Sequence, residues 1–166
     1  ATRQQAHGRS AAELRALAGR GAPGLIQSVA ALADRANLPG LSLQLAASLA
    51  NEDGRNHVQA LYPVPRWTPL GGFIVDRALV FALMRQESQF LPRVESAAGA
   101  LGLMQIMPST ARSVARQTGL KPLGERDALV DPELNLTLAQ EYIAMLLHDE
   151  HIHGNLLMFA CAWNGG

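Results

Sequence analysis

The sequence predicts a mainly α-helical protein with a small extended or hairpin segment, in which a larger domain follows a shorter set of helices. Three observations support this fold class. Of the 166 residues, 48% are hydrophobic and 17% are charged, and a charged fraction below the ~25% usual for soluble domains indicates much buried surface. Several apolar stretches have helical spacing and end at Pro, Gly or Asn. A segment with three prolines and two glycines, residues 62–72, separates the two parts of the chain.

The charge balance and the hydropathy pattern exclude two classes of protein. Fourteen Lys and Arg residues match fourteen Asp and Glu residues, so the basic surplus that binds nucleic-acid phosphates is missing. The longest apolar run, residues 78–84, is far shorter than the ~20 residues that span a bilayer. Residues 1–5 lack the apolar core of a signal peptide. We expect no nucleic acid partner and no membrane span, and the sequence identifies no protein partner.

Residues 1–61 are expected to form short helices joined by short turns. Ser10 and Glu13 predict a capping box at the start of the first helix. Two further amphipathic stretches, at about residues 25–36 and 41–50, predict the second and third helices. This arrangement favours the end of an α-superhelical (solenoid) domain, and a simple helical cap on the following domain is the alternative.

Residues 62–72 are the predicted Pro/Gly-rich joint, and residues 73–166 the larger domain. Pro108 is expected at the first position of a helix that ends near Gly119. Asp131 and Pro132 predict the N-cap and first position of a longer helix. Alternating residues within 96–106, with two glycines, favour the extended or hairpin segment. Helices are therefore expected at about 73–88, 108–119, 132–148 and 155–163.

Glu87 is the candidate catalytic residue. It follows the apolar run 78–84, which predicts a helix enclosed by protein on all sides. Burial and the negative end of the helix dipole both disfavour the ionised carboxylate, which suits a proton donor. Helix context alone favours the alternative, in which Glu87 pairs with Arg85 or Arg93 and ends the helix.

Four motifs change that interpretation. In chain order they are Glu87-Ser88, residues 96–108 with the sequence Gly-Leu-Met-Gln, Asp131-Pro132 with Asn135, and residues 162–166. Their order and approximate spacing resemble the catalytic domain of the soluble, slt-type lytic transglycosylases, which are relatives of goose-type lysozyme. The resemblance covers roughly residue 62 to the end. It implies a lysozyme-like fold for residues 73–166 and a catalytic domain that is incomplete at its C-terminal end.

The resemblance implies a peptidoglycan lytic transglycosylase in the periplasm or cell envelope. Such an enzyme cleaves the β-1,4 bond between N-acetylmuramic acid and N-acetylglucosamine without water and leaves 1,6-anhydromuramoyl ends. Glu87 matches the family's single glutamate, which acts first as acid and then as base. No metal or cofactor is implied. The alternatives are a lysozyme-like hydrolase, for which Glu95 is the best second carboxylate, and a non-catalytic glycan-binding module.

Five further residues match family positions that bind the glycan. Ser96, Gln105 and Met107 match positions beside the glutamate; an amide can hydrogen-bond an N-acetyl group or hydroxyl, and a thioether offers an apolar wall. Trp163 and Asn164 match the last motif, where the family has Tyr in place of Trp163. A tyrosine hydroxyl donates and accepts hydrogen bonds, whereas an indole only donates. Stacking on a sugar is possible with either ring.

The remaining features are expected to be structural. Ser88 is expected to hold the helix end. Cys161 is expected to be a small buried residue, because no neighbour provides the electropositive setting of a reactive thiol. The run 148–153, with three His and two acidic residues, is expected to be a solvated turn rather than a metal site. Gly99 and Gly102 would let the backbone approach a sugar, or are plain turn glycines.

Overall fold

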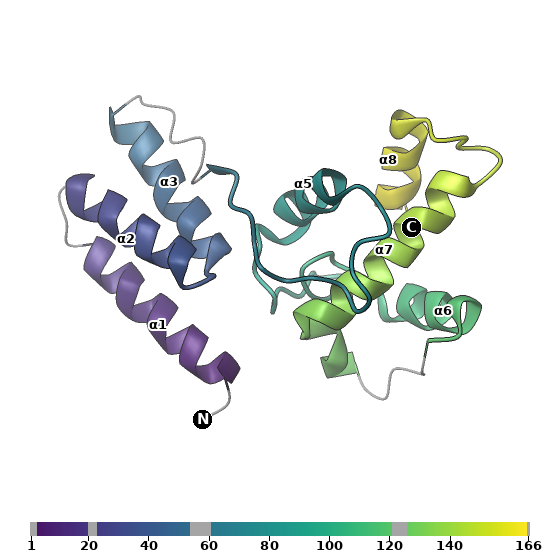
Figure 1. The fold of residues 1–166 in the computed structure, drawn as a ribbon, viewed down its shortest axis with the longest axis horizontal. Coiled ribbons are helices and arrows are strands. Elements are labelled where there is room, and N and C mark those ends of the chain that lie inside the picture. The colour runs from purple at the N-terminus through teal and green to yellow at the C-terminus, as the bar shows by residue number, and fades with distance from the viewer. Residues whose placement is uncertain (1–2, 20–22, 54–60, 121–125, 166) are drawn as a thin grey trace. The chain divides into compact units, whose positions relative to one another are not determined.

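The computed structural model describes residues 3–19, 23–53, 61–120 and 126–165 (Figure 1). The chain divides into two compact units, Ala1–Arg66 and Trp67–Gly166, which are treated separately below. The described residues are mostly helical, and where a small sheet would lie they have two isolated antiparallel bridges instead of strands. The predicted mainly α-helical fold class is confirmed.

The first unit contains three helices that pack against one another: α1 (Arg3–Ala18), α2 (Pro23–Arg35) and α3 (Pro39–Asp53). The predicted capping box is wrong, because Ser10 lies inside α1, which begins two turns earlier. The predicted end of the third helix falls partly on Gly54, which lies outside the described residues. The core of this unit consists of Ala18, Ile26, Val29, Ala30, Ala33, Leu41, Leu45 and Leu49.

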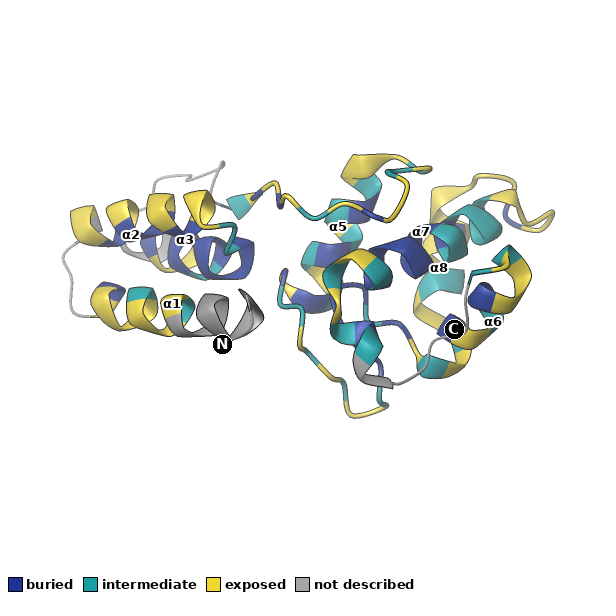
Figure 2. Cartoon of the chain, turned by 60° about the horizontal axis from the view of Figure 1, so that its bottom comes forward, coloured by how far each residue is buried: buried dark blue, intermediate teal, exposed yellow. Residues whose placement is uncertain are grey.

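The second unit is built around α7 (Pro132–His148), the long helix in its centre (Figure 1). Around it lie α5 (Arg77–Ser88), α6 (Pro108–Thr118), the short 3₁₀ helix η1 (Arg126–Val130) and α8 (Leu156–Gly165). Helices α6, η1 and α8 pack directly on α7. The buried residues of α7 (dark blue in Figure 2) are part of the core and include the polar residues Asn135, Thr137 and Gln140.

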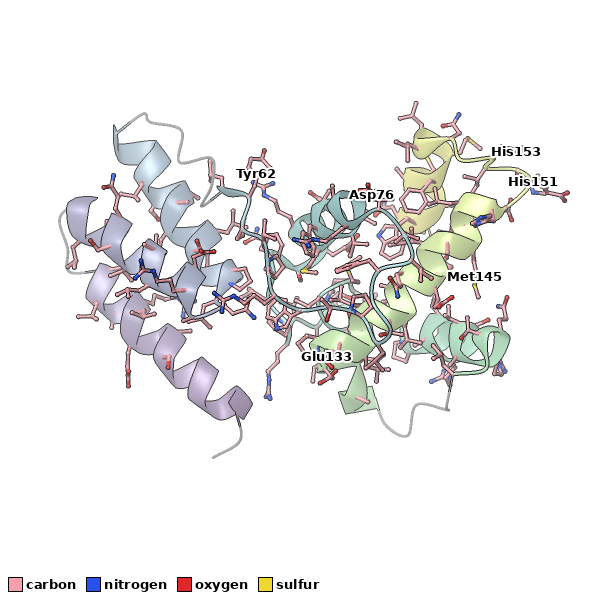
Figure 3. The ribbon with its side chains drawn as sticks, viewed as in Figure 1. Tyr62, Asp76, Glu133, Met145, His151 and His153 are labelled. Atoms are coloured by element: carbon pink, nitrogen blue, oxygen red, sulfur yellow. The ribbon has the colours of Figure 1, made fainter. Side chains whose placement is uncertain are left out.

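Local capping signals determine where the helices of this unit begin and end. Pro108 opens α6 and Gly119, with φ 71°, caps its C-terminus, as predicted. The Asp131 carboxylate accepts a hydrogen bond from the Leu134 N–H at 3.0 Å, as predicted for an N-cap. Helix α5 begins at Arg77 rather than at residue 73, because Asp76 caps it by accepting from the Leu79 N–H at 2.9 Å (Figure 3).

Two buried polar side chains of α7 hold the segment that leads into α5. The Thr137 hydroxyl accepts a hydrogen bond from the Leu70 N–H at 2.8 Å. The Gln140 amide accepts from the Ile74 N–H and donates to the Gly72 carbonyl, both at 3.0 Å. Residues 70–74 thus obtain from α7 the hydrogen-bond partners that they lack within a helix or sheet.

Two predictions about burial are wrong. Helix α5 is not enclosed: Val80 and Met84 are buried, whereas Ala78 and Ala82, one turn apart on another face, are exposed. Alanine can occupy a solvated face at little cost, so an all-apolar run does not require enclosure. Cys161 is exposed, because about 200° of helix rotation separates it from the buried Phe159.

Candidate active site

Glu87 lies in the last turn of α5 and is half-buried. The helix end that carries it is well held. The buried Ser88 hydroxyl donates to the Met84 carbonyl at 3.1 Å, as expected for a residue that secures this end. Gln89 caps the helix in a left-handed conformation with φ 50°, and its N–H donates to the Arg85 carbonyl at 3.2 Å.

The indole of Trp163 is the hydrogen-bond donor that meets Glu87. Its Nε1–H donates to Glu87 Oε1, with 2.9 Å between the heavy atoms, across 76 positions of sequence. Trp163 lies on α8 and is half-buried. Two of the predicted site residues therefore meet directly, one from α5 and one from α8.

The Trp163 ring is itself held by two other aromatic rings. The Tyr142 ring, from α7, has its centroid 5.6 Å away at a tilt of 37°, and the Phe159 ring, one turn earlier on α8, lies 6.2 Å away at 30°. Both separations are within the range of favourable aromatic contacts. The indole is thus supported from two helices, while the predicted stacking of Trp163 on a sugar stays a prediction.

The predicted extended segment forms a tight loop after α5 that reverses direction twice. Leu101 bridges both to Glu95 and to Ile106 in antiparallel fashion. The Leu101 N–H donates to the Ile106 carbonyl at 3.1 Å, and the Ile106 N–H returns a bond of 3.0 Å. The Gly102 N–H donates to the Val94 carbonyl at 3.0 Å. The expectation of a short extended or hairpin segment here is confirmed.

Asn135 anchors this loop to α7. The side chain is fully buried, its amide oxygen accepts from the Met104 N–H at 2.8 Å, and its amide nitrogen donates to the carbonyls of Leu101 at 3.0 Å and Leu129 at 2.8 Å. Asn135 belongs to one of the sequence motifs, yet its role as the anchor was not anticipated. Its three bonds join the loop, η1 and α7.

Gly102 is required by this anchor. Its φ is 80°, and a Cβ there would overlap the Leu129 carbonyl and the Asn135 amide. A side chain at this position would therefore push against buried backbone and against the anchoring amide. In this structure Gly102 allows the close approach of Asn135, and its approach to a sugar stays a prediction.

Ser96 and Gln105 both help to shape the loop. The Gln105 amide donates to the carbonyls of Val94 and Gly102, both at 3.0 Å, and the Ser96 hydroxyl accepts from the Ala100 N–H at 3.0 Å. Met107, the residue before α6, is 37% exposed, and Asn164 is exposed beside Trp163 on α8. The structure therefore joins Trp163 to Glu87, builds Ser96 and Gln105 into the loop, and leaves Met107 and Asn164 open to solvent.

Tyr142 and Phe159 are site residues that the sequence reasoning missed. A signal for Tyr142 was present, because it lies seven residues after Asn135 and so two turns along the same face of α7. Phe159 lies four residues before Trp163, which also puts the two rings on one helix face. Neither spacing shows by itself which tertiary neighbour a ring will meet.

The turn between α7 and α8 contains a contact between His151 and Asp149 at the surface. The His151 N–H donates to the Asp149 carboxylate at 2.8 Å, and the imidazole Nδ1 lies 3.1 Å from the same oxygen. The backbone N–H first, and the imidazole second, lower the pKa of Asp149. Figure 3 shows His151 and His153 at the tip of this turn. Within the ranges that the structure describes, no three His, Cys, Asp or Glu side chains are grouped to hold a metal ion.

Helices packed around α7, with a half-buried glutamate at the end of α5, are the arrangement expected of a lysozyme-like domain. The family model described as "Transglycosylase SLT domain" matches residues 72–166, and the chain belongs to this family. The resemblance inferred from the motifs is confirmed.

In the described parts of the chain, every helix is too short or too polar to cross a membrane.

Solved structures and curated relatives agree with this assignment. The 70 kDa soluble lytic transglycosylase of Escherichia coli has a similar fold, with a TM-score of 0.78 and 25% identity over 94% of this chain and 25% of that chain. Its complex with bulgecin A gives a TM-score of 0.77, also at 25% identity, over 93% of this chain and 25% of that one.

Two relatives show the same similarity in sequence. The soluble lytic murein transglycosylase of Escherichia coli strain K12 is 29% identical over 117 residues, which is 67% of this chain and 18% of the relative. The membrane-bound lytic murein transglycosylase C of Klebsiella pneumoniae is 42% identical over 73 residues, 43% of this chain and 20% of the relative. The chain thus spans well under a third of the length of these proteins.

Proposed function

We propose that this chain carries the catalytic domain, residues 73–166, of a peptidoglycan lytic transglycosylase. The observation that carries the proposal is the half-buried Glu87 at the end of α5, with one carboxylate oxygen held by the Trp163 N–H at 2.9 Å, inside a domain of the transglycosylase family. The names of the relatives, which are lytic murein transglycosylases, support the same substrate. A substrate of this kind implies a location in the periplasm or cell envelope.

The proposed reaction uses one carboxyl group twice. Glu87 first gives its proton to the oxygen that links C1 of N-acetylmuramic acid to N-acetylglucosamine, and the C1–O bond breaks. The resulting carboxylate then takes the proton from the 6-hydroxyl of the same muramoyl residue while that oxygen bonds to C1. The product has a 1,6-anhydro ring, Glu87 is again protonated, and no water is consumed. Partial burial helps, because the charges that develop during proton transfer interact with their neighbours more strongly there than in open solvent.

The glycan contacts are proposed to come from Ser96, Gln105, Met107, Trp163 and Asn164. Both N–H groups of the Gln105 amide already bind loop carbonyls, so this side chain would meet a sugar through its amide oxygen. The exposed part of Met107 offers an apolar surface to a sugar face. Asn164, exposed next to Trp163, offers an amide to the N-acetyl groups.

The decisive experiment compares the wild-type chain with Glu87→Gln on purified sacculi and weighs the released muropeptides. We expect wild-type products lighter by one water than hydrolysis products, and a loss of at least ~10²–10⁴-fold in rate for the variant, the usual contribution of general acid catalysis. Glu133→Gln, which changes an exposed glutamate in the first turn of α7 (Figure 3), is the matched control and should retain activity.

The alternatives give different results in the same assay. A product set that carries the extra water, together with a large loss in Glu95→Gln, would identify a two-carboxylate hydrolase and contradict the proposal. Undiminished digestion by Glu87→Gln would show that Glu87 is not the acid. Binding of sacculi without any products would identify a glycan-binding module.

A further inference from the structure

The contact between Trp163 and Glu87 pairs two groups with different roles. The indole can only donate a hydrogen bond, whereas the carboxyl group must carry a proton in one step of the reaction and lose it in another. An indole has one N–H and no acceptor atom. Its 2.9 Å bond to Oε1 is within the normal range for N–H···O hydrogen bonds. Whatever the protonation state of the carboxyl group, the hydrogen between Nε1 and Oε1 belongs to the indole.

We propose, on the basis of the function proposed above, that Trp163 is a positioning residue that makes Oε2 of Glu87 the oxygen that carries the catalytic proton. A proton on Oε1 that faced Trp163 would place two hydrogens against each other. A hydroxyl oxygen turned away from Trp163 would still be a weaker acceptor than the carbonyl oxygen of the acid. The favoured protonated form therefore has its hydroxyl on Oε2, and Oε1 remains the acceptor. The family's Tyr at this place, by the sequence resemblance, has a hydroxyl that can also accept, so it allows a proton on either oxygen.

The indole is held firmly enough for this role. The rings of Tyr142 and Phe159 lie 5.6 and 6.2 Å from it. The first comes from α7 and the second from α8, and these helices pack on each other. Both Glu87 and Trp163 are half-buried, and a hydrogen bond is stronger where water competes less. Rotation of the ring away from Glu87 would have to break these contacts.

One consequence concerns the geometry of the reaction. If Oε2 gives the proton to the glycosidic oxygen, the same Oε2 must receive the proton of the 6-hydroxyl in the second step. Both sugar oxygens must then reach the Oε2 side of the carboxyl group in turn, because Trp163 occupies Oε1. A substrate whose 6-oxygen cannot reach that side would be bound but not cleaved.

The first arm of the test is kinetic and uses the full chain. Trp163→Phe keeps an aromatic ring and removes the donor, so we expect kcat to fall by roughly 10- to 100-fold, the effect of one hydrogen bond to a charged group, with little change in KM. Trp163→Tyr restores a donor and should recover most of this loss. Trp67→Phe makes the same change at the other tryptophan and should leave kcat unaltered.

The second arm detects the contact without catalysis, and it does not require a variant of Trp163. In protein labelled with ¹⁵N-tryptophan there are two indole N–H signals, and Trp67→Phe assigns them. Glu87→Gln replaces a charged acceptor by a neutral one, so the Trp163 signal should move while the Trp67 signal stays. A tryptophan that merely fills the core would show no such response.

The outcomes separate the two proposals. A Trp163→Phe chain as active as wild type, a Trp163→Tyr chain no better than Trp163→Phe, or a Trp163 signal indifferent to Glu87→Gln would overturn the positioning role and leave the proposed function standing. A wild-type chain that releases no anhydro products would overturn the proposed function, and the positioning role with it, even with a responsive indole signal.

Discussion

Replacing Asn135 by Ala tests whether this buried amide is the main anchor between the loop after α5 and the central helix. The change removes three hydrogen bonds of 2.8 to 3.0 Å. It leaves the Met104 N–H and the Leu129 carbonyl without their partner, whereas the Leu101 carbonyl keeps the bond from the Ile106 N–H. All three residues are buried, with 5% exposure or less. The expected loss of stability therefore comes from buried polar groups that no longer have a hydrogen-bond partner in the core of the unit.

The size of the effect follows from the number of orphaned groups. A buried donor or acceptor left unpaired costs about 1–3 kcal/mol. Two of them cost about 2 kcal/mol even at the lower end of that range, which is a substantial part of the 5–15 kcal/mol by which a typical domain is stable. Asn135→Asp leaves no cavity but faces two carbonyls with a second acceptor, so we expect it to be at least as destabilising as Asn135→Ala.

Urea unfolding followed by tryptophan fluorescence measures this quantity in the right part of the chain. Trp67 and Trp163 both belong to the unit Trp67–Gly166, so the signal reports that unit and not the first three helices. The midpoint and slope give the free energy of unfolding. Asn164→Ala, at an exposed position on α8, is the control and should stay within about 0.5 kcal/mol of wild type. A loss below about 1 kcal/mol for Asn135→Ala would refute the anchoring argument.

Two further predictions concern the loop glycine and the surface turn. Gly102→Ala should destabilise the unit by about 1–3 kcal/mol more than Gly119→Ala in the same unfolding assay, because both have positive φ but only the Gly102 Cβ would collide with buried atoms; equal losses would contradict this. Because the folded-state pKa of Asp149 is lowered, its stabilising contribution is present above the unfolded-state pKa and lost as the pH falls through the folded-state value. His151→Ala keeps the backbone donor that is the larger cause, so an NMR titration should show the pKa of Asp149 rising only part of the way to its ordinary value; a complete return would assign the effect to the imidazole instead.

Helix ends that depend on adjacent residues were predictable from the sequence. Asp131, Pro108 and Gly119 act within one turn of their own position, and each is found where the sequence places it. The same local reasoning misplaced the start of the first helix, because the Ser10 and Glu13 pattern also fits inside a helix that begins at Arg3. A capping pattern identifies a start only where the preceding residues are not themselves helical.

Burial and long-range contacts were less predictable. The apolar run in α5 indicated enclosure, but enclosure depends on what packs against each face, and the face with Ala78 and Ala82 meets solvent. Glu87 was identified as the candidate acid from its motif, whereas its bond to Trp163 joins residues 76 positions apart and depends on how α5 and α8 meet. The periodicity of the sequence does not indicate how two helices pack on each other. The contacts of Tyr142 and Phe159 with Trp163 could not be predicted for the same reason.

The polar side chains along α7 also determine which changes of length the domain can accept. Four side chains spaced along this helix each contact a different partner: Asn135, Thr137, Gln140 and Tyr142. Inserting a single residue near residue 139, between Asn135 and Tyr142, would turn everything before or after it by about 100°. The loop anchor and the ring beside Trp163 could then no longer both keep their partners. The turn at 149–154, which is exposed at its tip, has no such coupling. We therefore expect homologous chains to differ in length at the turn and to keep the length of α7.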